Sequence, residues 1–386
     1  MQVTETIKYV GVNDHDIDLF EGQYDVRENG MAYNSYVVLG NKVAVADTVD
    51  AHFVEEWLGN VEAALAGRMP DYLVVHHMEP DHSAGIVAFM DRYPEAQVVA
   101  SKMAFKMMNA YFGTDFADRQ IVCKEGFELD LGGRTLSFIG AANVHWPEVM
   151  FSYDSQDKVL FSADAFGKFG ANDIEDPEGW ACETRRYYFG IVGKFGKNVQ
   201  AVLKKVASLD VERICPLHGP VLSENLPYYL GAYTTWSNYE PEDHGVTIAY
   251  VSVYGHTKQA AEELAGALRE KGETVSLFDL ARDDMAEAME DAFRYDRLVL
   301  ASITYTGGMF PFMNTFIHTL AEHAYQNRKV AFIESGTWAP AAAKAMRAQM
   351  EQMADIQFAE TVVTVRGSVD DAARTQIAAL ANELAE

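Results

Sequence analysis

Residues 72–82 read YLVVHHMEPDH, so a short apolar run leads directly into a cluster of metal-binding residue types. The run Tyr72–Val75 predicts a buried strand. Four potential ligands follow its end: His77, Glu79, Asp81 and His82. Neighbouring residues of an extended strand point to opposite faces, so His76 and His77 cannot both face one centre. We assign His77 to a metal and His76 to packing or a hydrogen bond.

Three further candidates lie far along the chain, each at or just past the end of a β-like stretch: His145, Asp164 and His218. Taken singly, each has the alternative of an ordinary core or surface residue. Buried carboxylates repel each other, and a buried charge needs a partner. Two divalent or trivalent cations would remove that cost and turn it into binding energy. We therefore predict that all seven residues converge on a dinuclear metal site.

The donor types narrow the choice of metal. Imidazole and carboxylate without thiolate suit iron, manganese or zinc rather than copper(I) or an iron–sulfur cluster. The spacing H-x-E-x-D-H resembles the H-x-H-x-D-H signature of the metallo-β-lactamase fold, whose hydrolases hold two zinc ions. Glu79 stands where those hydrolases have a second histidine. This harder oxygen donor favours iron, and zinc is the alternative.

Composition limits the class of protein. The chain has 386 residues, 49% of them hydrophobic, which is enough for two globular domains. A net charge of −26 argues against nucleic acid and against anionic membranes as partners. Cys123, Cys182 and Cys215 are scattered without a C-x-x-C motif, so no rubredoxin-type or iron–sulfur site is encoded. We see no signal peptide and no membrane-spanning run, and we expect a cytoplasmic protein.

Residues 1–243 are predicted to form a layered α/β sandwich, because short strands alternate there with helical patterns. The expected strands are 35–39, 42–46, 72–77, 97–100, 134–139, 149–153, 158–162 and 213–216, and the expected helices are 50–65, 101–111 and 184–208.

The polar segment 239–245 carries Pro241 and Gly245 and is predicted to be a linker. From residue 246 to 386, strands and helices alternate regularly, which predicts a doubly wound parallel sheet of five strands covered on both faces. The expected strands are 246–251, 274–278, 297–302, 329–333 and 361–365, with helices beginning near 257, 312, 340 and 369.

A second site is predicted at the carboxyl ends of these strands, where doubly wound sheets bind ligands. The loop after the first strand holds Ser252, Tyr254, Gly255, His256 and Thr257. Small and hydroxyl residues at a helix N-terminus favour a phosphate group. The loop matches neither G-x-G-x-x-G nor a Walker motif, which argues against a dinucleotide or a nucleoside triphosphate.

Two further loops each carry an aromatic residue beside small polar residues, which suits a planar ring. One contains Thr304, Tyr305, Thr306, Gly307 and Gly308, and the other contains Ser335, Gly336, Thr337 and Trp338. Ordinary strand-to-helix turns are the alternative, because they are also rich in such residues. Three such loops on successive strands favour a mononucleotide flavin, FMN.

These motifs together resemble the flavodiiron proteins from end to end. The resemblance rests on H-x-E-x-D-H at 77–82, HWP at 145–147, FSADAFG at 161–167, CPLHGP at 215–220 and the flavodoxin-like second half. It implies an N-terminal metallo-β-lactamase-like αββα domain (1–243) followed by a flavodoxin-like FMN domain (246–386). The flavin loops depart slightly, since the family commonly has Pro and Asn where this chain has Ile303 and Thr306, and often GSYGW in place of residues 334–338.

The resemblance also implies which residues bind each iron, which reaction takes place and how the subunits assemble. One iron would take His77, Glu79 and His145, and the other would take Asp81, His82 and His218, with Asp164 bridging them. The activity would be reduction of dioxygen to water, of nitric oxide to nitrous oxide, or of both. A separate donor would supply the electrons: rubredoxin, a flavin reductase or reduced deazaflavin. The flavin of one subunit would lie against the diiron site of the other in a head-to-tail homodimer, or in a pair of such dimers.

Three functions from different classes stay open. They are a flavodiiron gas reductase, a dinuclear zinc hydrolase with a flavodoxin-like appendage, and a flavin electron shuttle with a structural metal site. Tyr187 and Tyr188 are candidates for residues just outside the metal ligands, with core packing as their alternative role.

Overall fold

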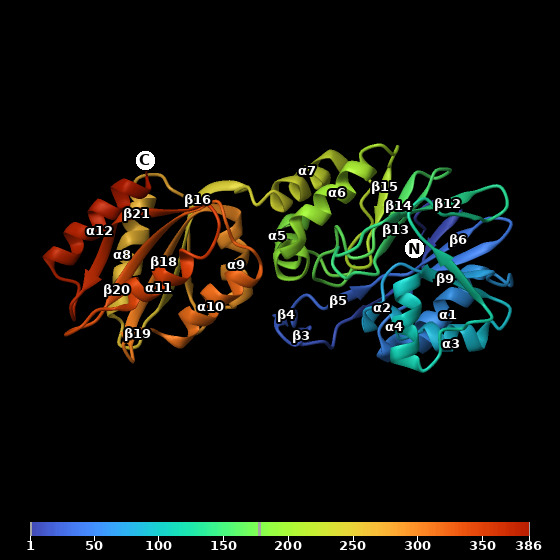
Figure 1. Ribbon diagram of the computed structural model, residues 1–386, viewed down its shortest axis with the longest axis horizontal. Coiled ribbons are helices and arrows are strands. Elements are labelled where there is room, and N and C mark those ends of the chain that lie inside the picture. Colours follow the sequence, from blue (N-terminus) through green and yellow to red (C-terminus); the bar gives the residue numbers. More distant parts are fainter. Residues whose placement is uncertain (1, 177–178, 386) are drawn as a thin grey trace. The chain divides into compact units, whose positions relative to one another are not determined.

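The computed structural model describes residues 2–176 and 179–385. The chain divides into two compact units, Met1–Thr234 and Thr235–Glu386 (Figure 1). None of the helices in the described part of the chain has the length and hydrophobicity that a membrane crossing requires.

Two sheets form the first unit. The first sheet has the order β1-β6-β7-β8-β9-β10, with strands β1 (Ile7–Tyr9), β6 (Tyr36–Leu39), β7 (Val43–Ala46), β8 (Tyr72–Val75), β9 (Gln97–Ser101) and β10 (Gln120–Cys123). The second has the order β11-β12-β13-β14-β15, with strands β11 (Glu128–Asp130), β12 (Thr135–Gly140), β13 (Met150–Asp154), β14 (Val159–Phe161) and β15 (Arg213–Cys215).

An apolar core lies between the two sheets. Val74 and Val99 of the first sheet belong to one buried cluster with Phe138 and Phe161 of the second. Helices lie around the two sheets (Figure 1). They are α1 (Val54–Leu65), α2 (Pro80–Ser83), α3 (Ile86–Arg92), α4 (Lys102–Phe112), α5 (Trp180–Tyr187), α6 (Gly196–Val206) and α7 (Leu226–Ser237). Because α1 and α4 pack on the first sheet and α6 on the second, the predicted αββα sandwich is confirmed.

The sequence signal missed two small hairpin-like sheets near the N-terminus, because their strands are only two or three residues long. They pair β2 (Val12–Asp14) with β5 (Met31–Tyr33), and β3 (Leu19–Phe20) with β4 (Tyr24–Asp25).

The helix expected over 184–208 is also interrupted. A π-helical segment (Tyr188–Val192) and a 3₁₀ turn (Gly193–Phe195) separate α5 from α6. The interruption lets the backbone at Gly190 approach the ring of Tyr24, whose hydroxyl donates a 2.8 Å hydrogen bond to the Gly190 carbonyl.

The second unit is a doubly wound sheet. Its strands are β16 (Asp243–Val251), β17 (Val275–Asp279), β18 (Tyr295–Tyr305), β20 (Arg328–Ser335) and β21 (Ile356–Val365), in the order β17-β16-β18-β20-β21. All neighbouring pairs in this order are parallel. This 2-1-3-4-5 order is that of flavodoxin, and it places the switch in strand order between β16 and β18. The predicted five-stranded parallel sheet is confirmed.

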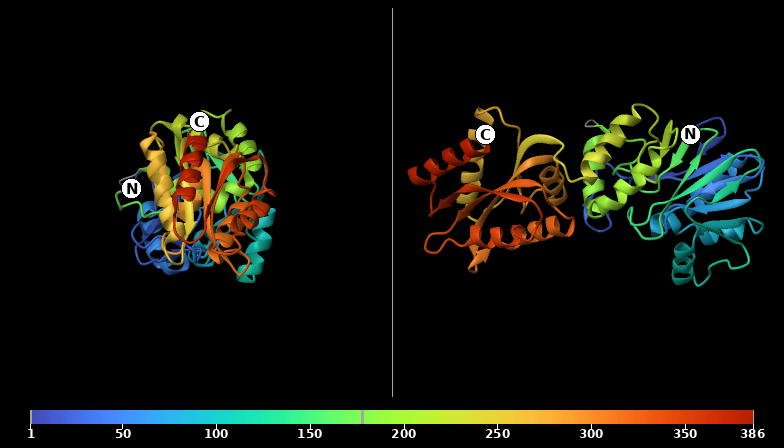
Figure 2. Two further views of the ribbon diagram at one scale, coloured as in Figure 1. Left: turned by 90° about the vertical axis from the view of Figure 1, so that its left-hand side faces the viewer. Right: turned by 45° about the horizontal axis from the view of Figure 1, so that its top comes forward.

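Helices cover both faces of this sheet (Figure 2). They are α8 (His256–Glu270), α9 (Met285–Arg294), α10 (Pro311–Glu322), α11 (Ala342–Met350) and α12 (Asp371–Leu384). Leu264 of α8 and Ile377 of α12 share one buried cluster with Ile248 and Val299 of the sheet.

Two details of the second unit were not expected. A short strand β19 (Gly308–Met309) pairs antiparallel with the end of β18, so residues 304–309 form a tight hairpin. Strand β16 also begins at Asp243, within the segment predicted to be a linker. Gly245 is tied there by a 3.0 Å hydrogen bond from its N–H to Oδ1 of Asp296.

Candidate metal centre and flavin site

The metal-ligand candidates gather at the ends of strands in the first unit. His77 follows β8 directly, and Asp81 and His82 lie on the single turn α2. His145 lies between β12 and β13, while Asp164 and His218 follow β14 and β15. Strands β7, β8 and β9 are mutually parallel, as are β14 and β15, so their carboxyl ends bring these loops to one edge of the sandwich.

One half of the cluster contains His77, Glu79, His145 and Asp164, whose candidate donor atoms lie within 4.8 Å of one another. Nε2 of His77 lies 3.2 Å from Oε2 of Glu79 and 3.4 Å from Oδ2 of Asp164. Nε2 of His145 lies 3.1 Å and 2.9 Å from the same two oxygens. The donor atoms therefore converge on one small volume.

The other half contains Asp81, His82 and His218. Nε2 of His82 lies 3.0 Å from Nε2 of His218 and 3.2 Å from Oδ2 of Asp81. Asp164 lies between the two halves, since its Oδ2 faces His145 while its Oδ1 lies 3.3 Å from Nε2 of His82. The structure thus brings all seven predicted residues together.

The electrostatics of this cluster suit bound cations. Burial disfavours the charged form of His145, yet its hydrogen bonds to Asp164 and Glu79 raise its pKa to about 9. Burial raises the pKa of Asp81 to about 7. Burial and the neighbouring His82 lower the pKa of His218 to about 3. Without a metal, the cluster must therefore distribute protons among groups that a metal would hold deprotonated.

Buried polar atoms without hydrogen bonds also indicate a metal site. Both carboxylate oxygens of Asp81, Nδ1 of His82 and Oδ1 of Asp164 are buried and make no hydrogen bond in the described chain. Oδ2 of Asp81 and Oδ1 of Asp164 have only ion-pair contacts, at 3.2 and 3.3 Å from Nε2 of His82. Leaving a buried charged oxygen without a hydrogen bond costs about 3 kcal/mol. Two imidazole nitrogens 3.0 Å apart, as in His82 and His218, also need a proton or a cation to share. The residues present therefore fit a dinuclear metal centre.

His76 takes no part in the cluster, and its predicted role in hydrogen bonding is confirmed. Its Nδ1 lies 2.6 Å from Oδ2 of Asp47, and its Nε2 lies 2.8 Å from Oγ of Ser152. Oδ1 of Asp47 also accepts the backbone N–H of His76, at 2.7 Å. This buried network fixes the chain where it leaves β8 and turns toward His77.

Aromatic rings wall the second half of the cluster. Phe20, Tyr33 and Tyr187 each lie with ring centroids 5.4–6.1 Å from that of His218. The Tyr187 hydroxyl is fully buried and has no hydrogen-bond partner among the described residues. Burial, then Asp164, raises the pKa of Tyr187 well above its usual value, so this hydroxyl keeps its proton. Tyr188 points elsewhere and packs against Phe189 and Tyr233.

The second unit contains a cavity of about 450 Å³ at the carboxyl ends of β16, β18 and β20. Eleven predicted residues line it: Ser252, Tyr254, His256, Thr257, Thr304, Thr306, Gly307, Ser335, Gly336, Thr337 and Trp338. Gly255, Tyr305 and Gly308 do not line it, whereas Val253, Ile303, Ala339 and Gly367 do. Tyr305 pairs with Gly308 across the hairpin and its ring contacts Phe310, at 5.0 Å between centroids.

The cavity suits a flavin mononucleotide. Gly255 is the N-cap of α8, has a φ of 93° and leaves the first turn of the helix without a side-chain cap in the described structure. Free N–H groups at a helix N-terminus bind phosphate. Tyr254 and Trp338 are 85% and 90% exposed, so both rings are available to cover a flat ligand. A 2.8 Å hydrogen bond between Thr257 Oγ1 and Ser335 Oγ holds two of the loops together.

Comparisons with known proteins found matches to both units of the chain. Residues 31–219 match the family described as ODP family beta lactamase, and residues 247–373 match a flavodoxin domain. The chain is 34% identical to putative diflavin flavoprotein A 2 of Synechocystis, over 71% of this chain and 48% of that protein. It is 28% identical to the anaerobic nitric oxide reductase flavorubredoxin of Vibrio vulnificus, over 88% of this chain and 70% of the relative.

Rubredoxin oxygen:oxidoreductase from Desulfovibrio gigas superimposes with a TM-score of 0.92 at 25% identity, over 100% of this chain and 97% of that structure. The chain belongs to the flavodiiron proteins. It spans about half the length of the Synechocystis relative. The flavodoxin domain of this flavodiiron protein implies FMN as its flavin.

Sequence reasoning missed two carboxylates beside the metal cluster of this flavodiiron protein. Glu21 lies in the turn between β3 and β4, and its carboxyl hydrogen-bonds to Glu79. Although Glu21 as a whole is exposed, loss of solvent around the carboxyl and the charge of Glu79 raise its pKa to about 7. Glu148 accepts a 2.8 Å hydrogen bond from Nδ1 of His77. The sequence feature that could have identified Glu148 is its position directly after the HWP motif at 145–147.

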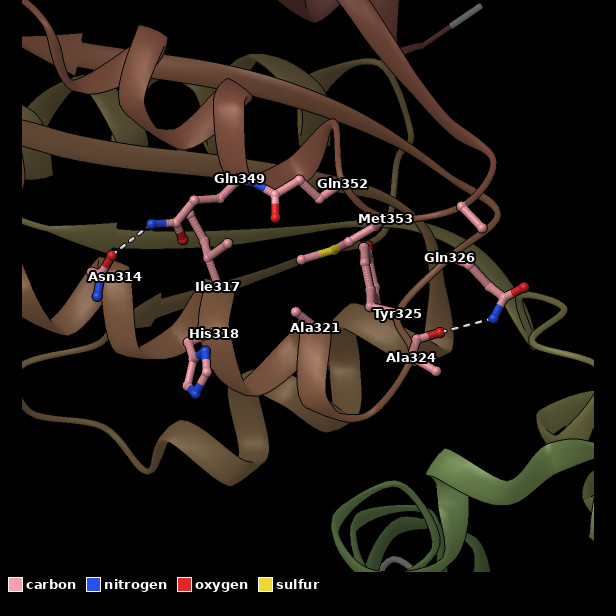
Figure 3. A pocket seen from close by; sticks show the side chains of 11 residues that line it. Asn314, Ile317, His318, Ala321, Ala324, Tyr325, Gln326, Gln349, Gln352 and Met353 are labelled. Atoms are coloured by element: carbon pink, nitrogen blue, oxygen red, sulfur yellow. Dashed lines mark hydrogen bonds between the residues drawn. The ribbon is translucent and has the colours of Figure 1, made fainter.

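A further cavity of about 550 Å³ lies in the flavodoxin unit (Figure 3). Its amides are already engaged, because Nε2 of Gln349 donates a 2.7 Å hydrogen bond to Oδ1 of Asn314, and Nε2 of Gln326 donates to the Ala324 carbonyl. Its described lining contains no Lys, Arg, Asp or Glu. We assign it no role in the chemistry of the protein.

Proposed function

We propose that this flavodiiron protein is an oxidoreductase that reduces dioxygen to water, nitric oxide to nitrous oxide, or both. The reaction takes place at a non-haem diiron site, with electrons delivered through FMN. The observation that carries this proposal is the convergence of seven imidazole and carboxylate residues in one buried cluster, on a chain that also carries a flavodoxin domain. The relatives named nitric oxide reductase and rubredoxin oxygen:oxidoreductase support it.

His77, Glu79 and His145 would hold one iron, Asp81, His82 and His218 the other, and Asp164 would bridge them. When bound, the irons supply Lewis acidity and the flavin accepts and passes on electrons one or two at a time. The protein would position the metal ligands and keep water away from the metal site. Phe20, Tyr33 and Tyr187 exclude water from the side of His218. The Tyr187 hydroxyl, buried beside His218 and without a hydrogen-bond partner among the described residues, would be available to donate a hydrogen bond to substrate on that side of the cluster.

Electron supply and assembly form the second part of the proposal. The donor that reduces the flavin has its redox centre outside residues 1–386, because the three cysteines in these residues are scattered and encode no rubredoxin site. Rubredoxin, a flavin reductase and reduced deazaflavin are the candidates. We propose a head-to-tail homodimer in which the flavin of one subunit serves the metal centre of the other. Analytical ultracentrifugation of the FMN-loaded protein tests the dimer, and a monomeric protein with full turnover would exclude it.

The test of function is anaerobic turnover with each gas and each candidate donor, paired with iron, zinc and flavin counts on native protein. We expect about two irons and one FMN per chain and consumption of at least one gas. Zinc in place of iron, with hydrolytic activity, would support the hydrolase instead. An iron-loaded protein with reduced flavin that consumes neither gas would support an electron shuttle.

A matched pair of variants locates the reaction. Asp164→Ala should lose iron and gas consumption while keeping its flavin, because Asp164 faces both halves of the cluster. Asp173→Ala removes an exposed carboxylate paired with His15 and should retain iron, flavin and turnover. Turnover retained by Asp164→Ala would exclude this site as the place of reaction.

A further inference from the structure

The outer nitrogens of the cluster's imidazoles have unequal partners. Nδ1 of His77 lies 2.8 Å from Oε1 of Glu148, a carboxylate. Nδ1 of His218 lies 2.8 Å from the carbonyl oxygen of Ala32, a neutral acceptor. Nδ1 of His82 has no hydrogen-bond partner within residues 2–176 and 179–385. The two halves of the metal cluster therefore differ just behind their donor atoms.

The orientation of His77 fixes which nitrogen faces the metal. Its Nε2 points to Glu79 and Asp164, so Nδ1 carries the proton and donates it to Glu148. Oε1 of Glu148 also accepts the backbone N–H of Met78, at 2.9 Å. Both hydrogen bonds hold the imidazole plane in place relative to the chain that leaves β8.

Glu148 is itself an unusual residue. Its side chain has no solvent exposure, and its Oε2 finds no partner in the described chain. A buried carboxylate with a free oxygen is costly unless nearby positive charge offsets it. The ion-pair partner of Glu148 in the described structure is His77 rather than a lysine or arginine, so positive charge reaches this carboxylate through His77.

We propose that Glu148 is a positioning residue that makes the two metal positions unequal, a conclusion that rests on the proposed diiron function. A carboxylate behind a ligating imidazole makes the imidazole a stronger donor and stabilises the more highly charged metal state. The position of His77, Glu79 and His145 therefore binds its metal more tightly than that of Asp81, His82 and His218. Its iron also has the lower reduction potential.

The competing explanation is that Glu148 merely pins the backbone of Met78. Glu148→Gln separates the two roles, because the amide oxygen can still accept both hydrogen bonds but carries no charge. Glu148→Ala removes both the charge and the acceptor. A purely structural role predicts that only the alanine variant differs from the native protein.

The experiment is a titration of metal-free, FMN-loaded, full-length protein with Co²⁺, followed by visible absorption. The native protein should bind Co²⁺ in two unequal steps. In Glu148→Gln the tighter step should weaken about 10- to 100-fold, the usual effect of losing such a partner, while the weaker step stays within about twofold. Asp173→Ala is the control, since it removes an exposed carboxylate that pairs with His15 and should leave both steps unchanged.

Two further measurements complete the test. In iron-loaded protein, a redox titration followed by electron paramagnetic resonance should show a higher potential for one iron in Glu148→Gln. His145→Ala should weaken the tighter Co²⁺ step and His218→Ala the weaker one, a comparison that does not need a folded Glu148 variant. Equal native steps, a reversed assignment, or an unchanged Glu148→Gln would each overturn the proposal. Absence of gas consumption with two unequal Co²⁺ steps would instead overturn the proposed function alone.

Discussion

Protonation of single residues governs how the metal-free protein responds to pH. The folded pKa of His145 is raised to about 9, and that of His77 lies well above its usual value, because Asp164 and Glu79 favour their charged forms. A raised histidine pKa contributes stability that is complete below the unfolded value of about 6.5 and is lost as the pH rises through the folded value.

We therefore expect the metal-free protein to lose about 2 kcal/mol of unfolding free energy between pH 7 and pH 9. Bound metal takes the place of these protons, so the metal-loaded protein should not become less stable over that range. Urea denaturation of both forms at each pH measures the difference. A metal-free protein that is equally stable at both pH values would contradict the assigned contacts of His145.

Tyr187 offers a second test at this scale. Tyr187→Phe keeps the ring that packs on His218 and Phe169 but removes the unpaired hydroxyl. A hydrogen bond to a charged group is worth about 1.5–3 kcal/mol, so we expect kcat to fall at least about tenfold. Iron content and the unfolding free energy should stay near native values. Native turnover in this variant would assign Tyr187 to core packing alone.

At the scale of helices and strands, the start of helix α8 restricts which residue the flavodoxin unit can use at one position. Gly255 has a φ of 93°, a backbone conformation that side chains disfavour, and it opens the helix whose N–H groups face the predicted phosphate. Gly266 lies inside the same helix, and a Cβ added there meets no atom within 4 Å.

The two glycines give a matched pair. Gly255→Ala should lower the unfolding free energy by about 1–2 kcal/mol and weaken FMN binding, because the loop must strain or move. Gly266→Ala should raise the unfolding free energy by about 0.5–1 kcal/mol and leave FMN binding unchanged. Flavin fluorescence titrations and thermal unfolding measure both effects. Equal FMN affinity in the two variants would show that the phosphate does not bind at this loop.

The strands and helices also show which features of the fold and the site could be predicted from the sequence. The donor residues were predictable because a strand pattern places its last residue at a sheet edge, and imidazole with carboxylate at several such ends points to a metal. The roles of Glu21 and Glu148 were not, since each depends on a contact with a residue far along the chain. The break between α5 and α6 occurs where Gly190 lies close to Tyr24, a contact that no helical periodicity encodes.

For the whole molecule, the two units carry separate ligands and separate cores. Ligands that bind only the folded state raise the stability of the unit that holds them. We expect calorimetry of the full-length protein to show two transitions, of which removal of iron lowers one and removal of FMN lowers the other. A single transition that responds equally to both removals would show that the units unfold together.

The metal residues come from both sheets of the first unit, His77 from the end of β8 and Asp164 and His218 from the ends of β14 and β15. Newly synthesised chains that have not bound iron lack this metal link between the sheets and hold the carboxylates only through protonated histidines. Such chains open more often, and proteases act on the opened state. The lifetime of this protein in the cell should therefore follow iron supply, with starvation removing the polypeptide as well as its activity.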